Sequence, residues 1–215
     1  MHLITDFFHF IFHLHDELPG FISAHGNMIY VLLFAVIFIE TGVVIMPFLP
    51  GDSLLFIAGS FAAIGQLNVA ALIGLLFVAA VLGDNSNYFI GKFFGHRATK
   101  IKLFGKNLVK QTNIDKTHGY FEKYGVRTII IARFIPIVRT ITPFVAGIGE
   151  MAYGKFLMFD VIGGALWISS MTLMGYFFGQ VPFIASHPEG VAVGIILISI
   201  LPMIVEIYRN RSKKS

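Results

Sequence analysis

The sequence has no cysteine and very few charged residues. The lack of cysteine excludes disulfide bonds, thiol nucleophiles and thiolate metal ligands. Only 13 % of the 215 residues are charged, whereas soluble domains carry about 25 %. By contrast, 56 % of the residues are hydrophobic, 23 of them are phenylalanine, and the mean hydropathy is +0.78. We therefore expect an integral membrane protein with one membrane domain over residues 1–215.

The N-terminal segment lacks the features of a cleaved signal peptide, because no Lys or Arg precedes its apolar run and no small-x-small site follows it. Polar residues, His9 and His13 among them, fall on one helical face, and most apolar residues fall opposite. This pattern predicts an interfacial amphipathic helix over residues 1–19. The i,i+4 spacing of His9 and His13 suits metal ligands, but no carboxylate–histidine site recurs nearby, so a polar face is the better interpretation. We predict no bound metal and no cofactor.

Four apolar runs are close to the length of about 20 residues that a transmembrane helix needs. They lie at residues 28–46, 67–94, 154–179 and 190–208. Two further apolar segments, residues 47–65 and 128–149, are interrupted by proline, glycine and charge. Broken backbone at membrane depth is tolerated where protein or water covers it, so we predict that both segments are re-entrant helical hairpins.

Charge placement predicts the orientation of the chain. Residues 96–127 form a basic loop with a short amphipathic segment, and the tail, residues 209–215, carries four basic residues. The positive-inside rule places both in the cytoplasm. Two predicted spans, 154–179 and 190–208, lie between the basic loop and the tail. These two crossings already return the chain to the cytoplasm, so the segment 128–149 must enter and leave by the same face. Counted back from the loop, the span 67–94 makes residues 47–65 enter from the outer face, and the span 28–46 then places the N-terminus in the cytoplasm.

An internal repeat supports the two hairpins. The string FLPGDSLLFIAG (48–59) resembles FIPIVRTITPFVAG (134–147), and the spans that follow end alike, in GKFFG (91–95) and GYFFG (175–179). One hairpin enters from each side, which predicts an inverted-topology repeat of residues 28–95 and 128–179. Such matched, broken segments indicate the midplane site of a transporter. The expected fold is thus an all-α polytopic membrane protein with two opposed re-entrant hairpins.

Buried charge is the feature that needs an explanation. Arg133 and Arg139 would each cost roughly 2.5–3.5 kcal/mol at the bilayer centre. Glu40 and Asp52 are the candidates to compensate them, and Asp84 and Asp160 are further acids within or near spans. One interpretation is purely structural: Glu40 and Asp52 neutralise the two arginines across the hairpins. Buried pairs add little net stability over apolar replacements, so stability alone is a weak reason to keep them.

The functional interpretation uses the chemistry of these groups. Arginine presents a planar fork of donors that suits phosphate and stays charged at cellular pH. A carboxylate that is removed from water takes up a proton more readily. The hypothesis is that Arg133 and Arg139 hold phosphate while Glu40 or Asp52 titrates. Accessory residues of this predicted site are Asp84, Pro50, Gly51, Pro136 and Pro143.

Other polar or unusual residues have plainer interpretations. The run Asp84-Asn85-Ser86-Asn87 reads equally well as a membrane-interface boundary. Trp167 lies in the middle of a span, away from an interfacial belt, and is assigned to packing. Glycines in the spans are expected to mark close helix packing rather than ligand contacts.

At these residues the sequence resembles the DedA family, also called the SNARE-associated or VTT-domain family. The strings FLPGDSLLFIAG, FEKYGVRTIIIARFIPIVRTITPFVAG and GYFFG carry the likeness, which covers nearly the whole chain and is greatest to bacterial members. The resemblance implies a bacterial inner-membrane protein with opposed re-entrant hairpins. It also implies movement of polyprenyl phosphate or phospholipid between leaflets, dependence on the proton motive force, and a part in envelope integrity. The family's essential acids match Glu40 and Asp52, and its essential arginines match Arg133 and Arg139.

Three functions therefore compete. The first is a flippase or scramblase for undecaprenyl phosphate or a glycerophospholipid. The second is a proton-coupled small-ion or drug antiporter, although two arginines would repel a cation. The third is a lipid phosphatase, which is disfavoured because no nucleophile with a paired histidine lies at depth. The expected partners are membrane lipids and not nucleic acid; a homo-oligomer is left open.

Overall fold

The computed structural model describes residues 26–42, 51–98 and 124–179, with short stretches at 102–103, 106–107, 119, 121–122 and residue 181. The predicted amphipathic helix (1–19), the span at 190–208 and the basic tail (209–215) lie outside the described residues, as do Pro50, His9 and His13.

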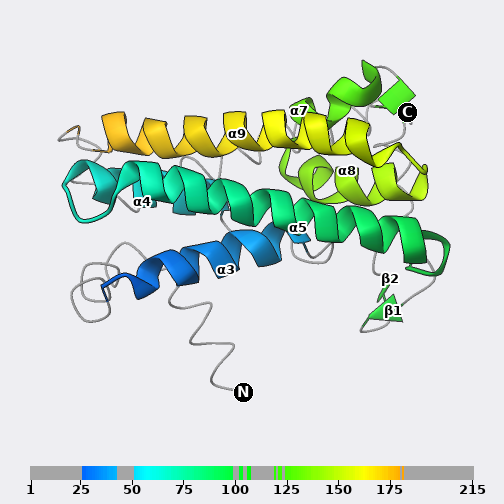
Figure 1. The fold of residues 1–215 in the computed structure, drawn as a ribbon, viewed down its shortest axis with the longest axis horizontal. Coiled ribbons are helices and arrows are strands. Elements are labelled where there is room, and N and C mark those ends of the chain that lie inside the picture. The colour runs from blue at the N-terminus through cyan, green and yellow to red at the C-terminus, as the bar shows by residue number, and fades with distance from the viewer. Residues whose placement is uncertain are drawn as a thin grey trace, which may run out of the picture.

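The described part is a bundle of helices, as the composition predicts (Figure 1). The two longest are α5 (Val69–Ala98) and α9 (Tyr153–Phe178), which lie side by side and run in opposite directions. Both contain apolar stretches long enough to cross a membrane, Val69–Phe94 and Tyr153–Phe178, close to the predicted spans 67–94 and 154–179. Both predicted helices are therefore confirmed, and each is long and apolar enough to be a candidate membrane span.

Shorter apolar helices pack on this central pair. Helix α3 (Met28–Gly42) begins where the predicted span 28–46 begins, and the last four residues of that span are not described. Helix α4 (Gly51–Ala63) has 13 residues, which corresponds to about 20 Å. This is less than the hydrocarbon thickness of about 30 Å.

The second broken segment forms two helices rather than one. Helix α7 (Thr128–Ala132) ends at Arg133, and α8 (Pro136–Ile148) begins at Pro136. Ile135 is extended, with φ −121° and ψ 103°, because the ring of a following proline disfavours the helical conformation. The predicted interruption of the segment 128–149 therefore occurs before Pro136. Pro143 lies inside α8 and cannot donate to the carbonyl of Arg139.

The connecting segment before α7 contains the one departure from an all-α architecture among the described residues. Strands β1 (Lys102–Leu103) and β2 (Lys106–Asn107) pair antiparallel, with Lys102 opposite Asn107. A 3₁₀ turn, η1 (Gly125–Arg127), leads directly into α7. Gly125 has φ +59°, a left-handed conformation that glycine adopts without a steric penalty.

The packing places apolar side chains both inside and outside the bundle. The main core lies between α3, α4, α5 and α9 and includes Leu33, Leu55, Leu76 and Ile168. Large apolar residues also face outward along α5 and α9; Phe93, for example, is 70 % exposed. A helix that is apolar on all sides is typical of a lipid environment, so these exposed rings agree with a membrane protein.

Candidate functional site

Arg139 is enclosed by two carboxylates from the first half of the chain. It lies in the first turns of α8 and is only 5 % exposed. Its Nη2 donates to Oε1 of Glu40 at 2.5 Å, and its Nη1 donates to Oδ1 of Asp52 at 2.9 Å. Glu40 is fully buried, and the side chain of Asp52 is 15 % exposed. The structure thus brings together three of the four predicted site residues.

The start of α4 explains why the two acids meet there. Asp52 lies in the first turn of this helix, and the carboxylate of Glu40 lies against Gly51, the first residue of the helix. Unpaired N–H groups and the helix dipole favour negative charge at a helix N-terminus. A side chain at Gly51 would overlap the Glu40 carboxylate. The structure thus places Gly51, a predicted accessory residue, directly beside Glu40.

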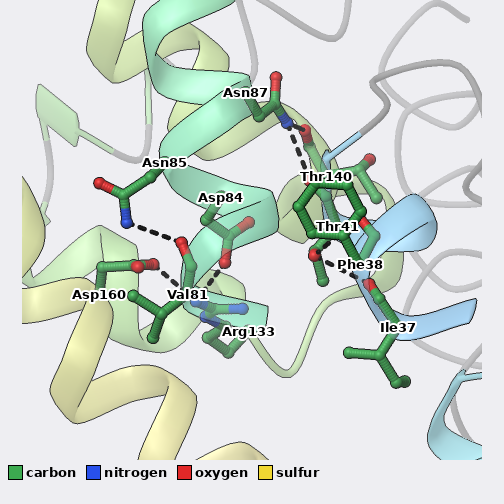
Figure 2. Close-up of polar contacts among 10 residues, drawn as sticks. All are labelled: Ile37, Phe38, Thr41, Val81, Asp84, Asn85, Asn87, Arg133, Thr140 and Asp160. Atoms are coloured by element: carbon green, nitrogen blue, oxygen red, sulfur yellow. Dashed lines mark hydrogen bonds and ion pairs between the residues drawn. The ribbon is translucent and has the colours of Figure 1, made fainter. Parts of the chain in front are cut away.

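Arg133 forms a separate cluster with different acids. It lies in the break between α7 and α8 and is 3 % exposed. Its Nη2 pairs with Oδ2 of Asp84 from α5, and donates to Oδ1 of Asp160 from α9 at 2.6 Å (Figure 2). The interpretation in which Glu40 and Asp52 divide between the two arginines is wrong, because both of them bind Arg139. Asp84, predicted as an accessory residue, is buried in an ion pair with Arg133.

Trp167 joins the two clusters, and its assignment to packing alone is wrong. Its Nε1 donates to Oδ1 of Asp52 at 2.8 Å. Its ring centre lies 4.3 Å from Cζ of Arg139 and 5.9 Å from Cζ of Arg133. A guanidinium at such a distance is attracted to the indole face, by about 2 kcal/mol where the pair is desolvated. One fully buried ring therefore contacts both cations.

Asn87 fixes the helices that carry the Arg139 cluster. From α5, its Nδ2 donates to the backbone carbonyl of Thr140 in α8 at 2.7 Å and to that of Thr41 in α3 at 3.3 Å (Figure 2). The side chain is fully buried. Glu40 precedes Thr41 and Arg139 precedes Thr140, so this one amide sets the separation of the paired charges.

Several charged atoms of both clusters lack a hydrogen bond to the described part of the chain. They are Nη1 of Arg133, Nε of Arg139, Oε2 of Glu40, both carboxylate oxygens of Asp84 and Oδ2 of Asp160. Buried polar groups are normally satisfied, so unsatisfied ones call for an explanation such as a missing ligand, water or proton. Together the clusters hold two guanidinium groups and four carboxyl groups.

The predicted site did not include Asp160, Trp167 or Asn87, although Asp160 was recognised as a further acid within or near a span. Asp160 and Trp167 are seven residues apart, with Gly163 and Gly164 between them, so all four share one face of α9. Both glycines lie against Arg133. A polar and glycine-lined stripe in an otherwise apolar helix was therefore the available signal.

Among the described residues, no group of three or more His, Cys, Asp or Glu side chains could hold a metal ion.

Comparisons with known proteins agree with one another. The VTT domain family matches residues 49–177. Protein DedA of Escherichia coli K12 is 44 % identical, with 98 % of this chain and 96 % of that protein aligned. An uncharacterized membrane protein of Mycobacterium leprae is 41 % identical over 83 % of the chain and 80 % of its own length. Inner membrane protein YqjA of Escherichia coli K12 is 32 % identical, with the same coverage of both. No solved structure matched the chain.

Proposed function

The chain belongs to the DedA family, and on that premise we propose that it moves a phosphate-bearing lipid between membrane leaflets. The substrate would be undecaprenyl phosphate or a glycerophospholipid, and the membrane would be the bacterial inner membrane, as for the relative named inner membrane protein YqjA. The observation that carries the proposal is Arg139, a cation buried in an apolar bundle between two carboxylates and an indole ring.

Phosphate chemistry explains the choice of arginine. The guanidinium forms paired, charge-assisted hydrogen bonds with carboxylate and with phosphate in the same planar geometry. A phosphate headgroup could therefore replace Glu40 and Asp52 as the partner of Arg139. The same exchange applies to Arg133 and its two acids. A lipid tail would remain in the bilayer beside the exposed apolar faces of α5 and α9.

Proton coupling follows from this exchange. Protonation of Glu40 or Asp52 removes its negative charge and weakens its hold on Arg139, which frees the cation for phosphate. Loss of the proton restores the ion pairs and expels the phosphate. A proton gradient across the membrane would then drive the lipid in one direction. The protein acts in this scheme as a transporter and not as an enzyme.

The helix arrangement supports the two predicted re-entrant hairpins. The hairpin helix α4 packs on α9, and its counterpart α8 packs on α5. Where α4 meets α9, Gly59 lies against the carbonyl of Thr172, and Gly175 lies against that of Phe56. A residue with a side chain would overlap the opposite backbone at either glycine.

The second half repeats these contacts. Where α8 meets α5, Gly147 lies against the carbonyl of Tyr88, and Gly91 lies against that of Phe144. In each of the four helices, the residue whose carbonyl is contacted lies three positions before the glycine of the same helix. Gly59 and Gly147 close the two longer repeated strings, and Gly91 and Gly175 open the two shorter ones. This reciprocal packing is what an inverted-topology repeat would produce.

A transport assay with a matched control tests the function. Purified protein in liposomes should exchange a labelled phosphate-bearing lipid between leaflets, faster with an imposed pH gradient. Arg139→Gln should abolish the exchange, because glutamine cannot pair with phosphate through two charged donors. Arg127→Gln, which removes an exposed arginine of η1, should leave it unchanged. Lipid exchange by folded Arg139→Gln at the wild-type rate would refute the proposal.

The alternative of a proton-coupled small-ion or drug antiporter makes a different prediction. Its proton flux would depend on the added ion or drug and not on the phosphate of the lipid. Proton flux in liposomes with and without phosphate-bearing lipid separates the two functions. The two buried arginines of the proposed site would repel a cationic substrate, which argues against this alternative.

A further inference from the structure

The two acids that bind Arg133 meet at a single nitrogen. Oδ2 of Asp84 and Oδ1 of Asp160 both contact Nη2, and the two carboxyl groups are also within hydrogen-bonding reach of each other. Each side chain is 1 % exposed. Two carboxylates this close and this deeply buried repel each other, which disfavours the state in which both are ionised.

Within the described part of the chain, no second positive charge is in contact with this pair. The charged groups that face Asp84 are Arg133, Asp160 and, beyond them, Arg139 from α8. Those that face Asp160 are Arg133 and Asp84. Helix α3 also packs on α5, but its acid, Glu40, binds Arg139. One guanidinium therefore faces two carboxyl groups.

Unsatisfied atoms in the cluster point to a missing partner. Among the described residues, Oδ1 of Asp84, Oδ2 of Asp160 and Nη1 of Arg133 have no hydrogen bond, although the side chains are at least nine-tenths buried. A proton on one carboxyl group would convert an acceptor into a donor toward the other carboxylate. It would also cancel the excess negative charge of the cluster.

We propose that Asp84 and Asp160 form a second proton-binding site, separate from Glu40 and Asp52, in which one proton is shared between the two carboxyl groups beside Arg133. The proton comes from water and binds a carboxylate oxygen, and no other bond forms or breaks. The assignment concerns proton binding alone and holds whatever solute the protein moves. It gives the molecule two acid pairs, each with one more carboxyl group than guanidinium.

The Arg139 cluster, which contains Asp52 and Glu40, differs in ways that make it a useful control. Asp52 accepts a hydrogen bond from Trp167, and its side chain is partly exposed. The Arg133 cluster has no such uncharged donor among the described residues.

Infrared spectroscopy of the full chain in lipid nanodiscs tests the shared proton directly. A protonated carboxyl group has a C=O stretching band that a carboxylate lacks, and the band moves in D₂O. We expect this band in the wild type at neutral pH. The substitutions are compared in a Glu40→Gln background, which removes any band from that buried acid. There, either Asp84→Asn or Asp160→Asn should abolish the band, because the remaining carboxylate then pairs one-to-one with Arg133 and ionises. Asp52→Asn should retain it.

Each contrary result overturns the proposal. A wild type without the band shows that both acids are ionised, even if every variant fails to fold. A band that survives one of the two Asn substitutions belongs to a single acid and is not shared. A band that disappears when sodium replaces choline at constant ionic strength shows that the acids hold a metal cation instead.

Unfolding measurements give an independent readout. Either single substitution should leave the unfolding midpoint nearly unchanged, because Arg133 keeps one carboxylate. The double substitution Asp84→Asn/Asp160→Asn should lower it by much more than the two single effects together, because the guanidinium is then buried without a counter-charge. Additive effects would contradict the shared arrangement.

Discussion

Replacement of Arg139 by methionine should destabilise the protein severely, and neutralising its partners should reverse that loss. In Arg139→Met, Glu40 and Asp52 remain buried without their cation. Removing one partner of a buried ion pair costs about 3–5 kcal/mol. That corresponds to a fall of about two to three and a half powers of ten in the folding equilibrium constant. The triple variant Glu40→Gln/Asp52→Asn/Arg139→Met contains no unpaired charge and should recover most of this stability.

Unfolding in mixed micelles, followed by the helical circular dichroism signal, measures the difference. Arg127→Met is the control, because this arginine is exposed and its loss should change stability by no more than about 0.5 kcal/mol. The triple variant should also fail to transport lipid, although it folds. The reasoning is wrong if the triple variant is as unstable as Arg139→Met. The function is wrong if the triple variant still moves lipid at the wild-type rate.

Two further substitutions test contacts that only the structure reveals. Trp167→Phe keeps an aromatic ring beside Arg139 but removes the donor to Asp52. The free energy of unfolding should fall by about 1.5–3 kcal/mol, the value of a hydrogen bond to a charged group. Trp167→Leu should lower it further in the same assay, and an equal loss in the two variants would show that the ring contributes nothing. Gly175→Val places a side chain against the backbone of Phe56 in α4. The variant should therefore lose thermal stability and lipid exchange together. A stable variant would show that α4 and α9 do not pack this closely.

The breaks and spans of the chain could be predicted because their causes are local. Hydrocarbon requires long apolar helices, which identifies residues 67–94 and 154–179 without any tertiary information. Proline restricts its own backbone and that of the residue before it, which fixes the break before Pro136. The repeated strings at 48–59 and 134–147 each end within a short apolar helix, α4 and α8.

The pairing of charges could not be predicted in the same way. The sequence offers four acids and two arginines, and several divisions between them neutralise the charge equally well. Arg133 meets Asp84 and Asp160 because α5 and α9 converge at the break between α7 and α8. Asp84 and Arg133 are 49 positions apart in the chain, so no local pattern relates them.

The sequence by itself determined that this is a helical membrane protein with arginines and acids in broken apolar segments, since hydrophobic run length and proline act within a few residues of chain. Only the tertiary structure decided that these charges form two separate clusters, with Trp167 in contact with the arginine of each. Helix packing decides this, because an ion pair or a ring contact requires atoms within a few ångströms, and that proximity depends on which helices cross and at which residues.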